Sequence, residues 1–164
     1  MGVLVIGFII LSDSRISIYT VATLLGIAIA LEGISLILAS SYLKEKNFYS
    51  LADLSLGSVF IAFGVIIMID TNIDFYLLGI FVVVVAFLSL LHQGMVLYER
   101  RLAGLKYGAI VGFGIVHVIF GALIIYSVAT EGALFNTIVG TYLLNLGVLI
   151  IISMIYSRND LEQI

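Results

Sequence analysis

The stretch LLGIAIALEGISLIL, residues 24–38, is apolar at nearly every position yet carries a carboxylic acid, Glu32, near its middle. It lies within an apolar segment from Tyr19 to Tyr42, which is long enough to cross the ~30 Å hydrocarbon core of a bilayer as a helix. With the usual rise per residue, Glu32 would lie roughly 15 Å from either end of that helix. The sequence therefore predicts a transmembrane helix with an acid at mid-depth.

The composition of the whole chain is that of a membrane protein. Of its 164 residues, 63% are hydrophobic and only 10% are charged, and the mean hydropathy is +1.29. The formal net charge is −3 and there is no run of basic residues, which argues against nucleic acid as a partner. The chain contains no cysteine, so neither disulfides nor cysteine-ligated metal or redox centres are expected.

Four further apolar segments have the length of a membrane span. They are 51–69, 75–97, 105–127 and 134–156. The segment 1–11 is apolar but about half as long, and it lacks the basic start and the cleavage site of a signal peptide. We therefore predict an all-α integral membrane bundle of six transmembrane helices, the first of them short. The bundle forms a single domain over residues 1–164, with a short tail at 157–164.

The distribution of charge predicts the orientation of the bundle. Six of the seven basic residues fall into one alternate set of the segments between spans. They are Lys44, Lys46, Arg100, Arg101, Lys106 and Arg158. The other set holds Asp13, Arg15, Asp70, Asp74 and Glu131. By the positive-inside rule the first set is cytoplasmic, so we expect a plasma-membrane protein with both termini in the cytoplasm.

Two pairs of a hydroxyl and a carboxylate have the spacing of a helix start. Ser50 with Asp53, and Thr71 with Asp74, match the pattern in which such side chains satisfy the unpaired amides of a first turn. For Asp53 we favour this capping role over a role as a ligand, because an acid near a helix start also complements the helix dipole.

Glycines recur along the chain and predict close helix packing. Gly7, Gly64 and Gly121 are 57 residues apart, and Gly57 and Gly114 repeat that interval. In the second span of each hairpin, small residues stand seven positions apart, as in Gly26 and Gly33, Gly79 and Ala86, and Gly140 and Gly147. Seven residues make nearly two helical turns, so each pair lies on one face, where another backbone can approach. We interpret all of these glycines as packing positions rather than ligands.

The 57-residue interval also predicts an internal repeat of three helical hairpins, at about 1–45, 50–103 and 104–158. Because each repeat holds two spans, the hairpins would share one orientation and be related by rotation about the membrane normal. In this register the counterparts of residues 51–57 would precede Met1. Either the chain starts late or its first helix begins inside the membrane.

The run GIAIALEGISLIL, residues 26–38, has two glycines separated by six residues, with an acid just before the second. It resembles the second helix of the HdeD-like membrane proteins, which are built from short hydrophobic repeats in three hairpins. Gly26, Glu32 and Gly33 match best. The chain departs from the family in having Ser-Asp-Ser at 12–14, where proline is frequent, and in having no tryptophan. The resemblance implies a membrane protein linked to acid resistance or stress, with no established reaction.

Common hydrolase, metalloprotease and phosphate-loop motifs are missing from the sequence, so we predict no catalytic, cofactor-binding or metal-binding residues and no enzymatic activity. Polar residues within the spans remain, and such residues are costly in a bilayer and often functional. The candidate intramembrane polar site consists of Glu32, Ser35, His117 and Asn145. We expect His92, which lies nearer the cytoplasmic end of its span, to reach water.

Helical periodicity divides the span around Glu32 into three faces. One is an apolar stripe suited to lipid, made of Ile27, Leu31, Ile34 and Leu38. A second is a close-packing face of Gly26, Ala30 and Gly33, and the third holds Ala28, Glu32, Ser35 and Ala39. Glu32 therefore points into the protein, where an ionised carboxylate is costly, so we expect a protonated acid. His117, at a similar depth, or Ser35 could accept its hydrogen bond.

Two classes of function fit these residues. The first is a non-enzymatic HdeD-like protein of stress response or the cell envelope, with the lipid bilayer as its surroundings. The alternative is a small channel or transporter in which Glu32 and His117 line a proton or solute path. A water-accessible cavity that reaches Glu32 would favour transport, whereas a dry core would favour a structural role. Asn145 would either be buried by its own neighbours or bond to a second subunit of a homo-oligomer.

Overall fold

The computed structural model describes residues 2–13, 16–42, 48–70, 73–102, 108–130, 132 and 134–161. These residues form helices and connections, with no strand among them. The helices are α1 (Gly2–Ser12), α2 (Ile18–Tyr42), α3 (Phe48–Ile69), α4 (Phe75–Leu102), α5 (Gly108–Ala129) and α6 (Phe135–Leu161).

Five of these helices, α2 to α6, are long and apolar enough to cross a membrane, and α1 is a shorter apolar helix of 11 residues. The predicted all-α class and the five long spans are thereby confirmed, and the fold is that of a multi-pass membrane protein. The large apolar side chains on the outside fit this conclusion. Ile27, Leu31, Ile34 and Leu38, the stripe predicted to face lipid, are all exposed.

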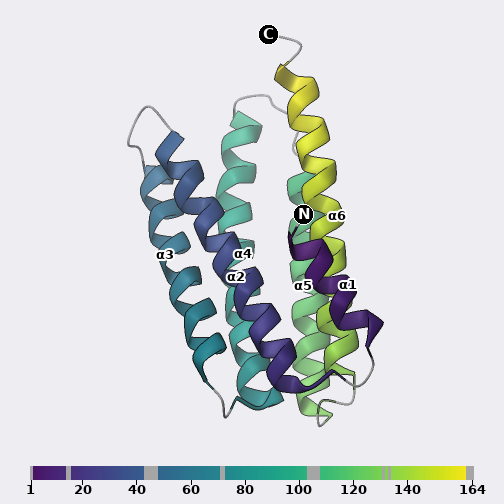
Figure 1. The fold of residues 1–164 in the computed structure, drawn as a ribbon. Coiled ribbons are helices and arrows are strands. Elements are labelled where there is room, and N and C mark those ends of the chain that lie inside the picture. The colour runs from purple at the N-terminus through teal and green to yellow at the C-terminus, as the bar shows by residue number, and fades with distance from the viewer. Residues whose placement is uncertain are drawn as a thin grey trace.

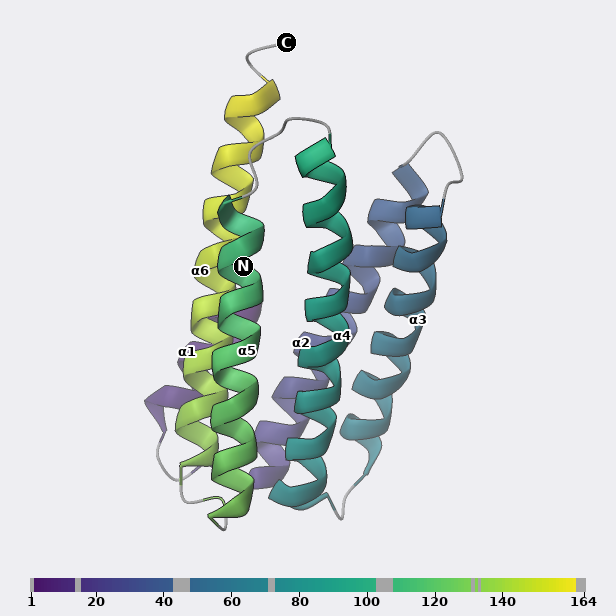
Figure 2. The same cartoon turned by 180° about the vertical axis from the view of Figure 1, so that it is seen from behind.

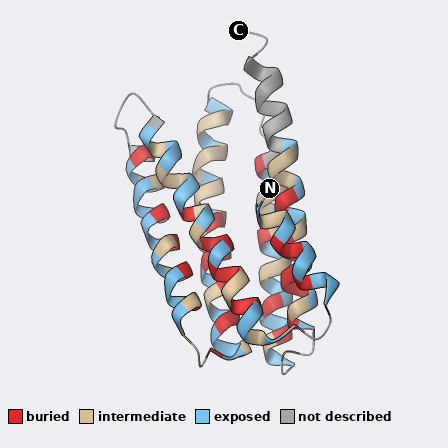
Figure 3. Cartoon of the chain, in the orientation of Figure 1, coloured by how far each residue is buried: buried red, intermediate tan, exposed pale blue. Residues whose placement is uncertain are grey.

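The helices run up and down, so the C-terminal ends of α2, α4 and α6 lie at one end of the bundle (Figure 1). We call it the basic end, because α4 finishes there with Arg100 and Arg101. Seen from behind, α4 stands between α3 on one side and α5 on the other (Figure 2). Buried residues gather on the faces that α1, α2, α4 and α6 turn toward one another (Figure 3).

The closest helix contacts join the predicted hairpins to one another rather than the two helices within a hairpin. α2 packs along α3, α6 along α1, and α4 along α5. Within the hairpins, α5 packs along α6 to a smaller extent, while α1 and α2, like α3 and α4, touch only sparsely. Glycine explains the close packing of α2 against α3, the first of these three helix–helix seams. A β-carbon added at Gly26 would lie 2.7 Å from the carbonyl oxygen of Gly64, and one at Gly33 would lie 2.5 Å from that of Gly57. The backbones of α2 and α3 therefore touch.

The other predicted packing glycines divide into two groups. A β-carbon at Gly7 would lie 2.9 Å from the carbonyl oxygen of Gly140, and one at Gly147 would lie 2.7 Å from the α-carbon of Leu4, so α1 and α6 also approach closely. The glycines of α5 have more space around them. A β-carbon at Gly114 would meet only a leucine side chain at 3.5 Å, and one at Gly121 would meet no described atom within 4 Å.

Both predicted helix starts are wrong in detail. α3 begins at Phe48, so Asp53 lies beyond the first turn and has no free amide to cap. Asp74 does cap a helix, but as the residue before α4 rather than as the third position inside it. Its Oδ1 accepts a hydrogen bond from the backbone N–H of Leu77 at 2.8 Å. Thr71, the predicted partner of Asp74, lies outside the described residues.

Candidate functional site

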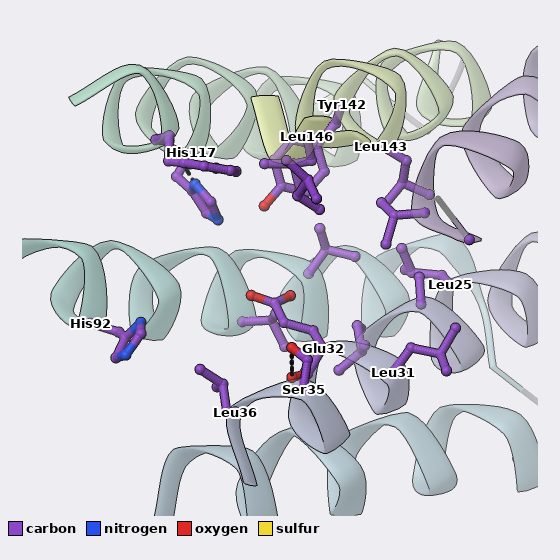
Figure 4. A pocket seen from close by; sticks show the side chains of 18 of the residues that line it. Leu25, Leu31, Glu32, Ser35, Leu36, His92, His117, Tyr142, Leu143 and Leu146 are labelled. Carbon is purple, nitrogen blue, oxygen red and sulfur yellow. Dashed lines mark hydrogen bonds between the residues drawn. The ribbon is translucent and has the colours of Figure 1, made fainter. Parts of the chain in front are cut away.

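A cavity of about 470 Å³ lies among α2, α4, α5 and α6, next to the start of α1 (Figure 4). Apolar side chains make up most of its wall, including Leu25, Val82, Val85, Leu143 and Leu146. The polar lining residues are Glu32, Ser35, His92, Gln93, His117 and Tyr142. Volumes of this size, with apolar walls and a few polar groups, are typical of small-molecule sites.

Glu32 reaches into this cavity from α2. Figure 4 shows its carboxyl group directed away from its own helix, toward the wall formed by α5 and α6. On the near side the hydroxyl of Ser89, a buried residue of α4, donates a hydrogen bond to Glu32 Oε1 at 3.2 Å. Glu32 therefore points into the protein, as its helix face predicts, and contacts both a side chain and open volume.

The predicted partners of Glu32 make other hydrogen bonds. The hydroxyl of Ser35 donates to the backbone carbonyl of Glu32 at 2.9 Å, which is the usual local bond of a serine within a helix. His117 bonds within its own helix, where Nδ1 donates to the carbonyl of Phe113 at 2.7 Å. Ser35 and His117 line the cavity beside Glu32, but the side-chain partner of the acid is Ser89.

His117 is 4% exposed and faces Glu32 across the cavity (Figure 4). Because a carbonyl only accepts, the bond to Phe113 places the proton of a neutral His117 ring on Nδ1 and leaves Nε2 as an acceptor. The ring stands edge-on to that of Tyr142, with centroids 5.7 Å apart and an interplanar angle of 88°. The wall opposite Glu32 is thus built from a histidine and a tyrosine held against each other.

His92 forms a second polar contact, nearer the basic end. Its Nε2 donates to Asp53 Oδ1 at 2.7 Å, joining α4 to α3, with side-chain exposures of 14% for His92 and 18% for Asp53. α4 continues to Leu102, about 15 Å beyond His92, and the prediction that His92 reaches water stays a prediction. Asp53, for which we favoured a capping role, is the partner of His92.

Asn145 lies away from the cavity. It is exposed on α6, and its amide donates to the backbone carbonyl of Thr141 in the same helix at 2.8 Å. The alternative in which neighbouring residues bury Asn145 is therefore wrong. A bond from this amide to a second subunit stays a prediction.

Two residues were missed at the sequence level, Ser89, which bonds to Glu32, and Tyr142, which lines the cavity, although the 57-residue interval relates both to residues of α2. Ser89 follows Glu32 by 57 residues, and one further interval leads to Leu146, which also lines the cavity. In two other sets at this interval all three residues line the cavity. They are Ala28, Val85 and Tyr142, and Leu36, Gln93 and Ile150. Applying the interval to Glu32 would have found Ser89, and applying it to Ala28 would have found Tyr142.

Among the described residues there is no group of three or more His, Asp or Glu side chains that could hold a metal ion. No family model matches the chain, and neither a curated protein nor a solved structure shows significant similarity to it. What can be said of function therefore rests on the cavity and its residues.

Proposed function

We propose that this multi-pass membrane protein is a small channel or transporter whose path includes the cavity at Glu32. The observation that supports the proposal is the open volume of about 470 Å³ against an acid near the middle of α2. A carboxyl group that served only to join helices would be enclosed by its partners. Glu32 instead has Ser89 on one side and free volume on the other.

The orientation we propose places the basic end in the cytoplasm and the protein in the plasma membrane. Arg100 and Arg101 lie at the end where α6 also finishes, in agreement with the bias of the basic residues. The cavity residue His92 then lies on the cytoplasmic side of Glu32.

We also propose that three hairpins, at about 1–45, 50–103 and 104–158, are related by rotation about an axis through the cavity. Support comes from the cavity wall, where residues of α2, α4 and α6 recur at intervals of 57. The three seams, α2 with α3, α4 with α5 and α6 with α1, would each join one hairpin to the next and close the ring.

The resemblance to the HdeD-like proteins, the link to acid stress and the absence of enzymatic activity all stay predictions. An intramembrane acid that exchanges protons would be consistent with the predicted link to acid stress. The cavity makes transport the better supported of the two function classes.

Cysteine labelling tests the proposal cleanly, because the chain has no cysteine of its own. Val85 lines the cavity and is 5% exposed, whereas its neighbour Val84 is 38% exposed on the outer face of α4. In proteoliposomes we expect a water-soluble thiol reagent to label Val85→Cys and to spare Val84→Cys, whose thiol would face hydrocarbon. Leu146→Cys, on the α6 wall, serves as a second cavity position. If the reagent labels neither Val85→Cys nor Leu146→Cys, the proposal is overturned.

A further inference from the structure

The polar groups that surround the free volume are mainly hydrogen-bond acceptors. Glu32 offers carboxyl oxygens, the neutral ring of His117 offers Nε2, and Tyr142 offers a hydroxyl oxygen on the same wall. The described lining residues include no lysine and no arginine. An anionic solute would therefore find no cation to pair with, whereas a cationic donor would find several acceptors.

The aromatic residues of the wall add to this preference. Tyr142 packs edge-on to His117, and its ring centroid lies 5.5 Å from that of Phe120 at an interplanar angle of 36°. Phe113 also lines the cavity. Aromatic faces attract cations.

From these observations we propose that the cavity binds a primary amine with an apolar body, as its ammonium ion, in exchange for the proton of Glu32. The inference rests on the proposed function and names its substrate class. The three N–H donors of the ammonium match acceptors on Glu32, His117 and Tyr142. The hydrocarbon part lies against the apolar wall, where Leu25, Val82, Val85 and Leu143 leave it room.

The exchange balances in atoms and in charge. In the empty cavity Glu32 is a neutral carboxylic acid, since an ionised carboxylate at this depth is costly. When the ammonium ion enters, the O–H bond of Glu32 breaks, one proton leaves to water and the carboxylate pairs with the ammonium. The site is neutral before and after binding. The titratable groups that face Glu32 across the cavity are His92 from α4, His117 from α5 and Tyr142 from α6, and none of them is a second carboxylate.

Titration calorimetry of the purified full chain in lipid nanodiscs tests the inference with three probes of one size: hexylammonium, 1-hexanol and hexanoate. We expect wild type to bind hexylammonium at least about tenfold more tightly than hexanol, with hexanoate not bound, because only the ammonium can form a charge-assisted hydrogen bond with the carboxylate of Glu32. Measuring the heat in buffers of different ionisation enthalpy should show about one proton released per amine bound.

Substitutions at Glu32 assign the effect. Glu32→Gln keeps the shape but cannot ionise, so it should bind hexanol as wild type does and lose both the preference for the amine and the proton release. Should Glu32→Gln fail to fold, Glu32→Asp should retain the proton release with weaker binding. As a matched control, Ser58→Ala on α3, away from the cavity, removes a hydroxyl that bonds to the backbone carbonyl of Leu54 and should leave both quantities unchanged.

Equal affinity of wild type for hexanol and hexylammonium, or proton release that persists in Glu32→Gln, would overturn the amine inference. Labelling of Val85→Cys would then still support a transport cavity. Failure of wild type to bind any of the three probes would also overturn the inference, and together with unlabelled Val85→Cys it would overturn the proposed function as well.

Discussion

The seam between α2 and α3 is closed by glycines that face each other across the two backbones, whereas in the seam between α4 and α5 a β-carbon at Gly79 or Gly114 would meet side chains of the partner helix. In the first, Gly33 and Gly57 face each other so closely that a β-carbon on either would lie 2.5 or 2.6 Å from the carbonyl oxygen of the other. In the second, Leu90 stands 57 residues after Gly33, and its side chain is what a β-carbon at Gly114 would meet. A bulky residue at this position holds the backbones of α4 and α5 apart.

The difference decides which helices reach the cavity. No described residue of α3 lines it, whereas α5 contributes Phe113 and His117. The residue 57 positions before His117 is Phe60, which is 1% exposed in the apolar core. A closed seam thus hides the aromatic residue of one hairpin, and a wider seam lets the next hairpin present a histidine to Glu32. Small changes at the seams can convert a packing helix into a wall of the site.

The largest effect should come from truncating these two counterparts. Phe60→Ala should lower the free energy of unfolding by about 3–5 kcal/mol, since it leaves a void in a packed core. His117→Ala borders an existing cavity, so it should cost only about 1 kcal/mol, chiefly its ring contact with Tyr142. Denaturant unfolding in detergent, followed by circular dichroism, measures both. If His117→Ala lowers the free energy of unfolding as much as Phe60→Ala does, the claim that His117 borders a cavity while Phe60 fills a packed core is wrong.

Alanine substitutions of the glycines test the two seams directly. Gly33→Ala places a methyl group against the backbone of α3 and should cost about 2 kcal/mol through overpacking. Gly121→Ala meets no described atom within 4 Å, and it should leave stability unchanged or raise it by up to about 1 kcal/mol through better helix propensity. The same unfolding assay applies. Equal destabilisation by the two changes would show that both seams are closed.

A smaller effect concerns the hydrogen bond of His92 with Asp53, which ties α3 of the closed seam to α4 of the wider one. A double-mutant cycle with His92→Gln and Asp53→Asn should give a coupling energy on the order of 1 kcal/mol. Strict additivity of the two single changes would mean that the contact contributes nothing to joining the seams.

The smallest effect is expected on α6, outside the two compared seams. Asn145 is exposed there, and an interhelical bond from its amide to a second chain would stabilise a homo-oligomer by about 0.6 kcal/mol. Crosslinking in membranes should therefore show slightly less oligomer for Asn145→Leu than for wild type. Val148→Leu, at another exposed position of α6, provides the control. Identical yields for Asn145→Leu and wild type would remove the case for this bond.

Much of the fold follows from the sequence because hydropathy and helical periodicity are local properties. They placed the five long spans, the lipid-facing stripe that includes Ile27, and the inward direction of Glu32. Periodicity within one helix gives a face but not the neighbour on that face. The bond between His92 and Asp53 was out of reach for this reason, since it depends on which helices adjoin and on how far α4 extends.

The internal interval supplies some of the missing neighbours, with limits set by individual side chains. It relates Glu32 to Ser89 and could have predicted their contact. It also suggests that Gly121 packs as Gly64 does, which it does not. Gly64 packs against Gly26, and the interval from Gly26 leads to Val83 on α4 rather than to a glycine. A repeat in one helix predicts packing only when its partner keeps the matching residue.

Difference infrared spectroscopy of wild type against Glu32→Gln tests the central claim most directly, because it reports the protonation of Glu32 and its access to water together. At neutral pH we expect wild type to show the carbonyl band of a protonated carboxylic acid that is missing in Glu32→Gln. This band should shift on transfer to heavy water, since the cavity lets the acid proton exchange. A carboxylate band at neutral pH, or an acid band that does not shift in heavy water, would contradict the account.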